Sequence, residues 1–501
     1  MKRAFIRISN CASRISSTAP LESILPLTLA AALAGCAVGP DYRPPNVNTP
    51  AAYRLADSDP NALSGTNSFA DLGWWEIYDD PQLVAYIAEA LTNSWDVKIA
   101  AARILQAQAA ARITRSQFFP TVSAAGDLVT SRASERGPSP IPSSLDPQAE
   151  FGDTFVSMPS YEVDLWGRIR RANEAARARL LATEDARRTV CQTLVAEVAA
   201  TYFRLLEFDL EVEIGRHSYT SRTNSLALTV TREEGGVASL QDVYQAKVLV
   251  ATAEAAIVSA LRQREQAENE LSILLGRNPG KIDRGIPLAK QPLRSHVPAG
   301  LPSSLLARRP DIRGAEQQLI AATADIGQAR AAFFPQLALT GIYGYQTTSL
   351  SDLFSSPART WQFGPSVTMP LFTGGRLRGE LSQAKARFDE TLAIYQQTVQ
   401  GAFREVSDAL IAYQRTREFF AKQRDLTEAN RGAAKLAGIR YEGGVTSYLE
   451  VLYNEQQLFD TELGLARARL DELLSVVQLY RALGGGWQAP AQAAQAKSGS
   501  R

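Results

Sequence analysis

The residue types that carry most enzyme and metal chemistry are sparse in this chain of 501 residues. The two histidines, His217 and His296, lie far apart and lack the short spacing of metal ligands. The adjacent carboxylates Glu233 and Glu234 are more typical of a solvated surface than of an acid–base pair. Neither a phosphate-binding loop nor a nucleophile elbow occurs. We therefore expect no enzyme, no catalytic residue, no metal site and no cofactor apart from a covalent lipid.

One cysteine is a candidate for covalent modification. A basic N-terminal stretch precedes the apolar residues 24–34, which are too few to span a bilayer and instead predict a secretory signal. The signal ends in Leu33-Ala34-Gly35-Cys36, and small residues before a cysteine are typical of lipoprotein signals. We predict a signal peptide over 1–35 and a lipidated Cys36, with palmitate as one acyl group. An ordinary signal beside a chance cysteine, or a start codon farther downstream, is the alternative.

The remaining bulk properties exclude several classes. Cys191 has no partner once Cys11 leaves with the signal, so no disulfide is expected in the mature chain. The formal charge of +1 gives no basic excess that would indicate nucleic-acid binding. The mature chain has no run of 18 apolar residues, so we expect no transmembrane helix. A lipoprotein of this kind either lies at a membrane surface or spans it with strands.

The two halves of the chain are copies of one unit. Residues 232–243 reappear as residues 440–451, at an offset of 208. Gly167-Arg168 returns at the same offset as Gly375-Arg376, and Phe118-Phe119-Pro120 returns as Phe333-Phe334-Pro335 at an offset of 215. A duplication this long predicts two structural units of about two hundred residues each.

Each half predicts a pair of long helices. Two windows of 119 residues without proline follow Pro159 and Pro370, and proline is excluded from helix interiors. From Leu381 to Tyr413, apolar residues recur at steps of three and four, which is a helical stripe. We expect a long helix, a Gly-Gly turn and a returning helix in each half. The expected ranges are 168–234 with 238–276 and 376–439 with 446–483, and shorter helices are expected over 91–118 and 304–333.

Four segments predict β-strands. Apolar and polar residues alternate in 155–165, 337–345 and 361–369, and more weakly in 121–131. About ten residues with one apolar face match a transmembrane strand. A soluble hairpin gives the same pattern, but the lipoprotein signal and the helix lengths favour membrane strands. Four strands cannot close a barrel around water, so we expect several copies to join their sheets, with the long helices forming a tube below.

Independent motifs occur in order along the chain, from Cys36 to about Gly486. They are Cys36-Ala37-Val38-Gly39-Pro40-Asp41-Tyr42-Arg43, Trp74-Trp75 with Tyr78 and Asp80-Pro81, Arg308-Arg309-Pro310-Asp311-Ile312-Arg313, Phe333-Phe334-Pro335, and Pro370-Leu371-Phe372 with Gly374-Gly375. With these motifs the chain resembles the TolC-like outer-membrane efflux proteins, and within them the lipoprotein branch of the OprM/NodT type.

The resemblance implies a mixed α/β membrane protein. In such a homotrimer, a twelve-stranded outer-membrane β-barrel, with four strands from each chain, continues into a twelve-helix periplasmic α-barrel with an equatorial α/β collar. It also implies the exit duct of a tripartite pump that expels small toxic compounds or drugs from a Gram-negative cell, which gives multidrug resistance. The implied partners are a periplasmic adaptor (a membrane fusion protein), an inner-membrane RND-type transporter and outer-membrane lipid. The implied location is the outer membrane, lipid-anchored and extending into the periplasm, and Ala37 after the cysteine agrees with that export.

The expected domain organisation follows from the duplication. We expect a signal peptide over 1–35, a lipid-anchored tether and equatorial segment over 36–90, and a first efflux repeat over 91–279. An equatorial linker over 280–303, a second repeat over 304–484 and a tail over 485–501 complete the chain.

The two Gly-Gly turns are the first candidate site. The duplication places them at the helix ends opposite the strands, and the resemblance makes these ends the periplasmic tips. Two glycines can simply reverse the chain, but the repeated flanking residues are better explained by docking of the adaptor. The expected tip residues are Gly235, Gly236, Val237, Ser239 and Leu240 in the first half and Gly443, Gly444, Val445 and Ser447 in the second.

The residues just after the turns are gate candidates. Asp242 and Glu450 are equivalent in the two halves, and threefold symmetry would place their charges around a narrowing pore. Leu449 could add an apolar constriction. The resemblance also marks Tyr441, at a position that bonds across helices to the acid equivalent to Asp242. Thr446 and Tyr453 depart from the family pattern and put the details of this network in doubt, and surface acids at a helix start are the alternative.

Other functions are weighed against the efflux duct. The nearest is the outer-membrane channel of a type I protein secretion system. A lipid-anchored coiled-coil spacer without a pore predicts the long helices but not the four strands, and a periplasmic enzyme lacks a site. The sequence identifies neither the cargo nor the cognate adaptor and pump.

Overall fold

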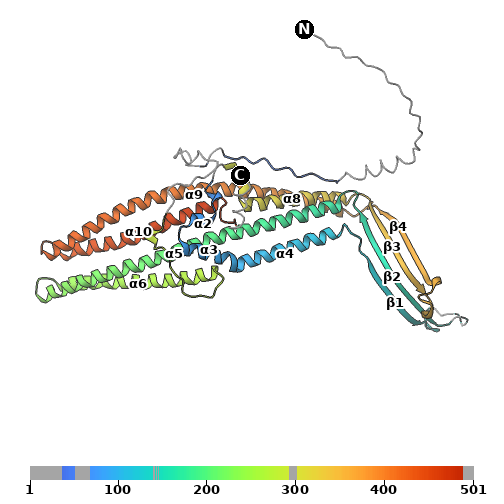
Figure 1. The fold of residues 1–501 in the computed structure, drawn as a ribbon, viewed down its shortest axis with the longest axis horizontal. Coiled ribbons are helices and arrows are strands. Elements are labelled where there is room, and N and C mark those ends of the chain that lie inside the picture. Colours follow the sequence, from blue (N-terminus) through green and yellow to red (C-terminus); the bar gives the residue numbers. More distant parts are fainter. Residues whose placement is uncertain are drawn as a thin grey trace, which may run out of the picture. The chain divides into compact units, whose positions relative to one another are not determined.

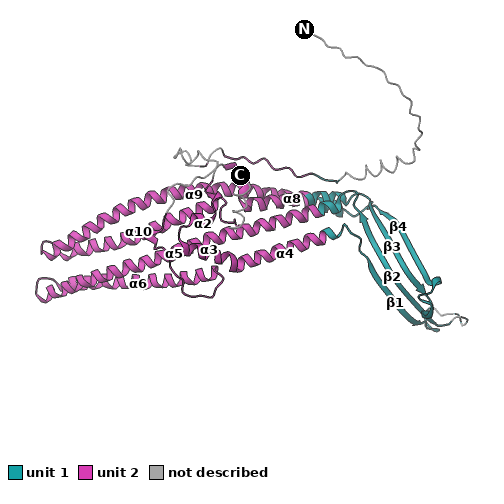
Figure 2. Cartoon of the chain, in the orientation of Figure 1, with its two compact units in different colours: residues 1–40, 115–172, 324–382 teal, residues 41–114, 173–323, 383–501 magenta. Residues whose placement is uncertain are grey.

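A computed structural model of the chain describes residues 37–50, 53, 68–138, 142, 144, 146–292 and 302–488. The chain forms two compact units, the first made of residues 1–40, 115–172 and 324–382, and the second of the remaining segments (Figure 2). The predicted signal peptide, Cys36 and His296 lie outside the described residues.

Unit 1 contains a single antiparallel sheet in the order β1-β2-β3-β4 (Figure 1). Its strands are β1 (Ser123–Arg132), β2 (Gln148–Val163), β3 (Gln336–Thr347) and β4 (Arg359–Thr368). All four strands were expected, but β2 begins seven residues earlier than its alternating pattern, because it pairs with β1 as far as Gln148. The register of β2 shifts between Met158 and Tyr161, where Pro159 lacks the N–H that a regular ladder needs.

Two pairs of long helices lie mostly in unit 2. The helices are α5 (Arg168–Glu234) with α6 (Leu240–Leu274) and α9 (Arg376–Glu442) with α10 (Tyr448–Ala482). The expected ranges are reproduced to within a few residues at each end. The 67 residues of α5 and of α9 give helices about 100 Å long at ~1.5 Å per residue. Each long helix ends in a Gly-Gly turn, after which the chain returns antiparallel.

The shorter helices differ from the expectation in number. The helix expected over 91–118 takes in the end of one helix, α3 (Pro81–Asn93), and a second helix, α4 (Trp95–Ser116), and Ser94 between them has a non-helical ψ of 137°. The helix expected from residue 304 is likewise divided into α7 (Pro302–Arg308) and α8 (Pro310–Ala331). Here Pro310 disfavours helical backbone at the preceding residue. The remaining elements are α2 (Trp74–Ile77), η3 (Phe69–Asp71), η4 (Leu288–Lys290), η5 (Leu350–Asp352) and η6 (Ser356–Ala358).

The main buried core of unit 2 joins the middle of the long helices to the shorter elements. Its fully buried members include Leu83 and Ile87 of α3, Leu205 of α5 and Leu271 of α6. Asp80 is the polar centre of this core, because its carboxylate caps α3 and accepts hydrogen bonds from five donors. The donors are Gln82 N, Leu83 N, Tyr202 Oη at 3.0 Å, Ile286 N at 3.0 Å and Gln291 Nε2 at 2.8 Å. A buried carboxylate needs such partners, which explains the Asp-Pro motif.

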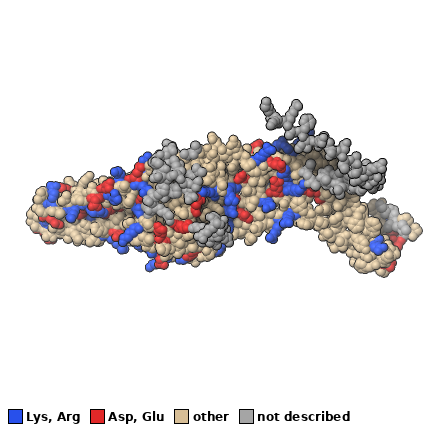
Figure 3. All heavy atoms as spheres, turned by 45° about the horizontal axis from the view of Figure 1, so that its top comes forward, with Lys and Arg blue, Asp and Glu red and all other residues tan. Residues whose placement is uncertain are grey.

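The surfaces of the two units differ in charge. Basic and acidic side chains are interspersed along the helices, whereas the face of the sheet in view carries few of them (Figure 3). Exposed apolar side chains on the strands include Leu128, Val156, Trp361, Phe363 and Val367. Such a surface is unfavourable in water and suits a lipid environment.

Among the helices that the structure describes, one is apolar enough to cross a membrane by length and composition. An 18-residue window of α6 has a mean hydropathy of 1.2, and 28% of it is buried. A helix that packs on neighbours along an apolar face passes the same test, and buried Ala246, Leu249, Ala253 and Ala260 form such a face on α6.

Candidate functional site

The turn between α5 and α6, here the first tip, is closed by local hydrogen bonds. Gly236 has φ of +73°, which glycine adopts without strain, and Val237 N donates to Arg232 O at 2.8 Å. Ser239 caps α6, with Asp242 N donating to its Oγ at 3.2 Å. Asp242 Oδ2 in turn accepts from Ser239 N at 3.0 Å and Ser239 Oγ at 2.8 Å. This is a capping box, so the first gate candidate is engaged with its own helix start.

The turn between α9 and α10, the second tip, has the same backbone but different side-chain partners. Gly444 has φ of +71° and Val445 N donates to Arg440 O at 2.9 Å. Ser447 makes no side-chain cap. Glu450 instead accepts from the hydroxyl of Thr446 and pairs with Arg440 Nη1 at 3.2 Å. The second gate candidate therefore ties the end of α9 to the start of α10.

Arg232 of the first tip contacts the second tip. The guanidinium of Arg232 lies 4.2 Å from the ring centroid of Tyr441, and its Nη2 donates to Glu442 O at 3.1 Å. Tyr441 packs on Tyr448 with ring centroids 5.4 Å apart. The Tyr441 hydroxyl is buried without a hydrogen-bond partner among the described residues. The structure of one chain thus brings the tips together through Arg232 rather than through a Tyr441–Asp242 bond.

Several tip side chains remain exposed. Val237, Leu240, Val445 and Leu449 are all more than half exposed. Side chains exposed to this extent contribute little to packing within the chain, and clustered exposed apolar residues are typical of a contact surface.

A buried polar cluster links the hairpins farther from the tips, and the sequence analysis missed it. Arg222 of α5 is 1% exposed. Its Nη1 donates to Leu249 O of α6 at 2.8 Å and its Nη2 to Gln456 Oε1 of α10 at 3.1 Å. Glu455 accepts from Ser225 Oγ at 3.1 Å, and burial raises the pKa of Glu455. The sequence did offer a signal for this cluster. Arg222 lies at helical spacing on the same face of α5 as the buried residues Val212, Gly215 and Thr229.

Two further buried acids lie where α5 faces α10. Glu207 and Glu211 are each less than a tenth exposed, and Arg467 Nη2 donates to Glu211 Oε1 at 3.1 Å. Burial raises the pKa of Glu207 to about 8, and the charge of Glu211 contributes in the same direction. Burial and the neighbouring carboxylate therefore favour the protonated form of Glu207, while Arg467 pairs with Glu211.

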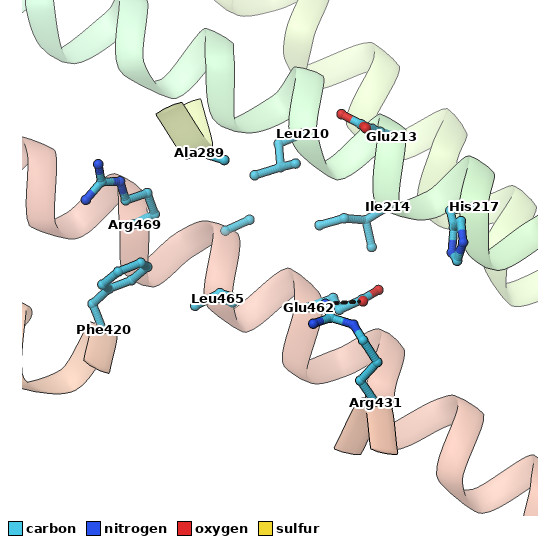
Figure 4. A pocket seen from close by; sticks show the side chains of 11 residues that line it. Leu210, Glu213, Ile214, His217, Ala289, Phe420, Arg431, Glu462, Leu465 and Arg469 are labelled. Carbon is cyan, nitrogen blue, oxygen red and sulfur yellow. Dashed lines mark hydrogen bonds and ion pairs between the residues drawn. The ribbon is translucent and has the colours of Figure 1, made fainter. Parts of the chain in front are cut away.

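A cavity of about 450 Å³ lies between the two hairpins, beside η4 (Figure 4). Leu210 and Ile214 of α5 and Leu465 of α10 give it an apolar wall, and Phe420 and Arg469 line its other side. Arg431 Nη2 is bound to Glu462 Oε1 at 3.0 Å. His217 lies at the edge of the cavity. No group of three or more metal-binding side chains occurs within the described part of the chain.

The chain that follows Cys36 is fixed in unit 1, at the inner corner where β2 leads into α5. Val38 N donates to Trp166 O at 2.9 Å. Gly39 lies so close to Gly327 that a Cβ on Gly39 would come within 2.4 Å of the Gly327 Cα, and a Cβ on Gly167 would come within 2.9 Å of Ala37. The glycines are therefore required for the passage of the N-terminal segment over this corner.

Comparison with known proteins gives consistent matches. The model of the outer membrane efflux protein family matches residues 86–277 and 301–485. The chain is 37% identical over 469 residues to the solvent efflux pump outer membrane protein SrpC of Pseudomonas putida, covering 92% of this chain and 98% of SrpC. It is 36% identical to the outer membrane protein OprJ of Pseudomonas aeruginosa, covering 93% and 96%. The open-state structure of the MtrE outer membrane channel of Neisseria gonorrhoeae superimposes with a TM-score of 0.81 at 30% identity, covering 90% and 99%.

Proposed function

The chain belongs to the outer membrane efflux protein family, and on that premise we propose that it is the exit duct of a tripartite pump completed by a periplasmic adaptor and an inner-membrane RND-type transporter. The resemblance expected from the sequence, the fold class, the outer-membrane location and the role in efflux are confirmed by this membership. The observation that best supports a duct is the four-stranded sheet, whose two outer edges are unpaired within the described chain. Helices of 67 residues continue from its strands.

The duct is a homotrimer in this proposal. The outer edges of β1 and β4 have no partner within the described chain, and such edges are not tolerated in hydrocarbon. Three copies of the sheet give twelve strands, enough for a closed barrel around a water-filled channel. The two helical hairpins of each chain, repeated in three copies, then form the periplasmic tube. The shorter elements around Asp80 form the collar.

Lipidation of Cys36 is part of the proposal. The N-terminal segment from Ala37 to Gly39 is held at the inner corner, where residues 164–167 connect β2 to α5. This corner is the boundary between the apolar strands and the charged helices, which is the depth at which an acyl chain attached to Cys36 would enter the membrane. The proposed domain boundaries follow the two repeats, 91–279 and 304–484.

The tips are the proposed adaptor-binding surface and gate. Exposed Val237, Leu240 and Val445 offer apolar contacts beside the paired glycines. Asp242, Tyr441, Leu449 and Glu450 are the proposed gate residues. In a single chain the Arg440–Glu450 pair closes the second tip and the contact of Arg232 with Tyr441 joins the two tips, so opening requires that these contacts separate.

Small apolar toxic compounds are the proposed cargo. SrpC is named for solvent efflux, and other relatives are named for toluene and antibiotic efflux. The chain acts by providing a passage, with no catalytic residue, metal or cofactor. Protein cargo in a type I secretion system is the second candidate. The deletion experiment below distinguishes it from small-molecule cargo.

The test is deletion of the gene in its host, followed by susceptibility measurements with organic solvents, dyes and antibiotics. We expect sensitivity to several unrelated compounds, restored by the wild-type gene and only partly by a Cys36→Ala variant with an ordinary secretory signal. Unchanged susceptibility together with loss of a secreted protein would overturn drug efflux in favour of protein secretion.

A further inference from the structure

A second cavity of unit 2 is larger than the one in Figure 4 and differs from it in charge. Its volume is about 580 Å³, and it lies between α3, α4, α5 and the residues that follow α10. We propose that this cavity, here the Trp487 cavity, binds a small organic anion with a flat apolar body, such as an aromatic carboxylate. Such a site does not depend on the proposed duct, because all its lining residues belong to one unit of one chain.

One part of the wall of the Trp487 cavity is apolar. Leu91 of α3 and Ile104 of α4 line it, and Trp487 supplies an aromatic face. The position of that indole is fixed, because Trp487 Nε1 donates to Gly484 O at 2.9 Å. Concave sites of roughly 300–1,000 Å³ with apolar walls and a few polar groups are typical of binding sites for small molecules. The cavity therefore has the size and the lining for one small ligand.

The other part of the wall carries positive charge. Arg187 and Arg188 of α5 line the cavity beside Glu184. Arg188 shares the buried Asp185 with Arg313 of α8, whose Nη2 lies 3.6 Å from Asp185 Oδ1. Three guanidinium groups therefore lie near two carboxylates. The positive charge in excess favours an anionic ligand over a cationic one.

Arg187 is the cation that a ligand can engage. Arg188 already bonds to Asp185, and its guanidinium carbon lies 5.3 Å from the ring centroid of Trp487. Arg187 is exposed and has no hydrogen bond or ion pair within the part of the chain that the structure describes. A guanidinium with free donors binds a carboxylate through two parallel hydrogen bonds. Arg187 is thus the residue that holds the carboxylate of the ligand.

A buried donor without an acceptor also lines the Trp487 cavity. Trp74 is 2% exposed, and its Nε1 has no hydrogen-bond partner among the described residues. The Trp74 ring packs edge-to-face on Trp75, with ring centroids 5.3 Å apart. Buried N–H groups are nearly always paired, so an unpaired one in the wall of a cavity indicates a place for an acceptor. An anion supplies an acceptor, whereas a hydrocarbon or an ammonium group does not.

Cys191 provides a native reporter at the same place. It follows Arg187 by four residues on α5, so the two side chains lie on one face of the helix, and both line the cavity. Burial raises the pKa of the Cys191 thiol, and the charge of Arg187 acts in the opposite direction. A ligand held by Arg187 therefore covers the thiol and slows its modification.

Alkylation of Cys191 tests the site in the purified mature channel in a neutral detergent. The probe is naphthoate, and naphthylmethylamine is the control with the same rings and the opposite charge. Peptide mass spectrometry follows the reaction of N-ethylmaleimide at Cys191 and separates it from any reaction at Cys36. At about ten times its half-protecting concentration, naphthoate should slow alkylation about tenfold by mass action. The amine should leave the rate unchanged.

Two arginine variants make the test specific. Arg187→Gln should raise the half-protecting concentration of naphthoate on the order of tenfold, because it removes a charge-assisted hydrogen bond. Arg177→Gln changes an exposed arginine of the same helix that does not line the cavity, and it should have no effect. Each rate is compared with that of the same variant without probe, since loss of the Arg187 charge by itself alters the thiol. Both variants should keep the thermal midpoint of the wild type.

Three outcomes overturn the anion site. Equal protection by the amine would make the cavity an unselective apolar surface. Protection that Arg187→Gln leaves intact would place the probe elsewhere. A Cys191 thiol that is inert in the folded wild type would exclude a ligand from the cavity, and reactivity gained by a chain that ends at Gln488 would identify residues 489–501 as the occupant. None of these outcomes bears on the duct, which the susceptibility measurements test separately.

Discussion

The two tips have nearly the same sequence and the same turn, but their carboxylates do different things. Asp242 caps its own helix through Ser239, whereas Glu450 binds Thr446 and Arg440. The first tip has Ala238 where the second has Thr446, and its arginine, Arg232, contacts the opposite hairpin instead. The comparison teaches that local sequence fixes the turn, while contacts between hairpins decide which side chains are left for a gate.

The largest difference between the tips is at one pair of equivalent positions. Tyr448 is 3% exposed and packs on Tyr441, whereas its counterpart Leu240 is 57% exposed. Tyr448→Ala should cost about 3–5 kcal/mol of the free energy of unfolding, by loss of buried contacts. Leu240→Ala should change it by no more than about 0.5 kcal/mol. Denaturant midpoints of the purified channel measure both. Equal losses would mean that another surface covers Leu240.

A smaller effect separates the two capping serines. Ser239→Ala should destabilise the channel by about 1 kcal/mol, because it removes the cap of α6. Ser447→Ala should cost only a few tenths of that, since Ser447 makes no side-chain cap. Thermal midpoints in detergent compare the two variants. If Ser447→Ala is the more harmful change, the capping difference between the tips is wrong.

Substitution of the gate residue in the second tip should also have a larger effect than substitution of the gate residue in the first. Glu450→Ala breaks a part-exposed ion pair between α9 and α10, and such a pair contributes up to about 1 kcal/mol, or about fivefold in open probability. Asp242→Ala should raise open probability less, because its bonds stay within one helix start. Single-channel recordings in planar bilayers measure the open probability and conductance of both variants. Glu450→Gln is the control of equal size. Unchanged conductance in the double alanine variant would remove both residues from the gate.

The smallest expected effect is a dependence on pH that comes from Glu207 of the first hairpin and has no counterpart at the equivalent position of the second. Glu207 is buried, but the equivalent residue of the second hairpin is Arg415, which is exposed and pairs with Glu418. With the pKa of Glu207 raised from 4.5 to about 8, the folded state retains a proton that the unfolded state loses. Stability should therefore fall as pH rises from about 4.5 to about 8 and level off above that.

Glu207→Gln should reduce this dependence, because the amide does not titrate. Thermal midpoints between pH 5 and pH 9 compare the variant with the wild type. Glu211, Arg467 and Asp471 all face Glu207, so Arg467→Gln serves as a control that leaves two acids without their cation and should steepen the fall. A wild type with no slope in this window would place the proton elsewhere.

Much of the architecture was predictable from periodicity and repetition. The absence of proline and the spacing of apolar residues predicted α5 and α9 almost to the residue, because helix geometry is set locally. The Gly-Gly turns were predictable for the same reason. The division at Ser94 was not, because nothing in the apolar pattern changes there. Asp80-Pro81 did carry a helix-start signal, and its meaning became clear only with the buried donors around the carboxylate.

The sequence by itself determined the duplication, the long helical hairpins, the alternating strands and the family, because each depends on short-range patterns or on motifs in order. Only the tertiary structure decided that Arg222 is buried between hairpins, that burial raises the pKa of Glu207 and that Arg232 donates a hydrogen bond to the opposite tip. These properties depend on which atoms exclude water from a side chain and which donors remain within reach, and residues far apart along the chain supply both.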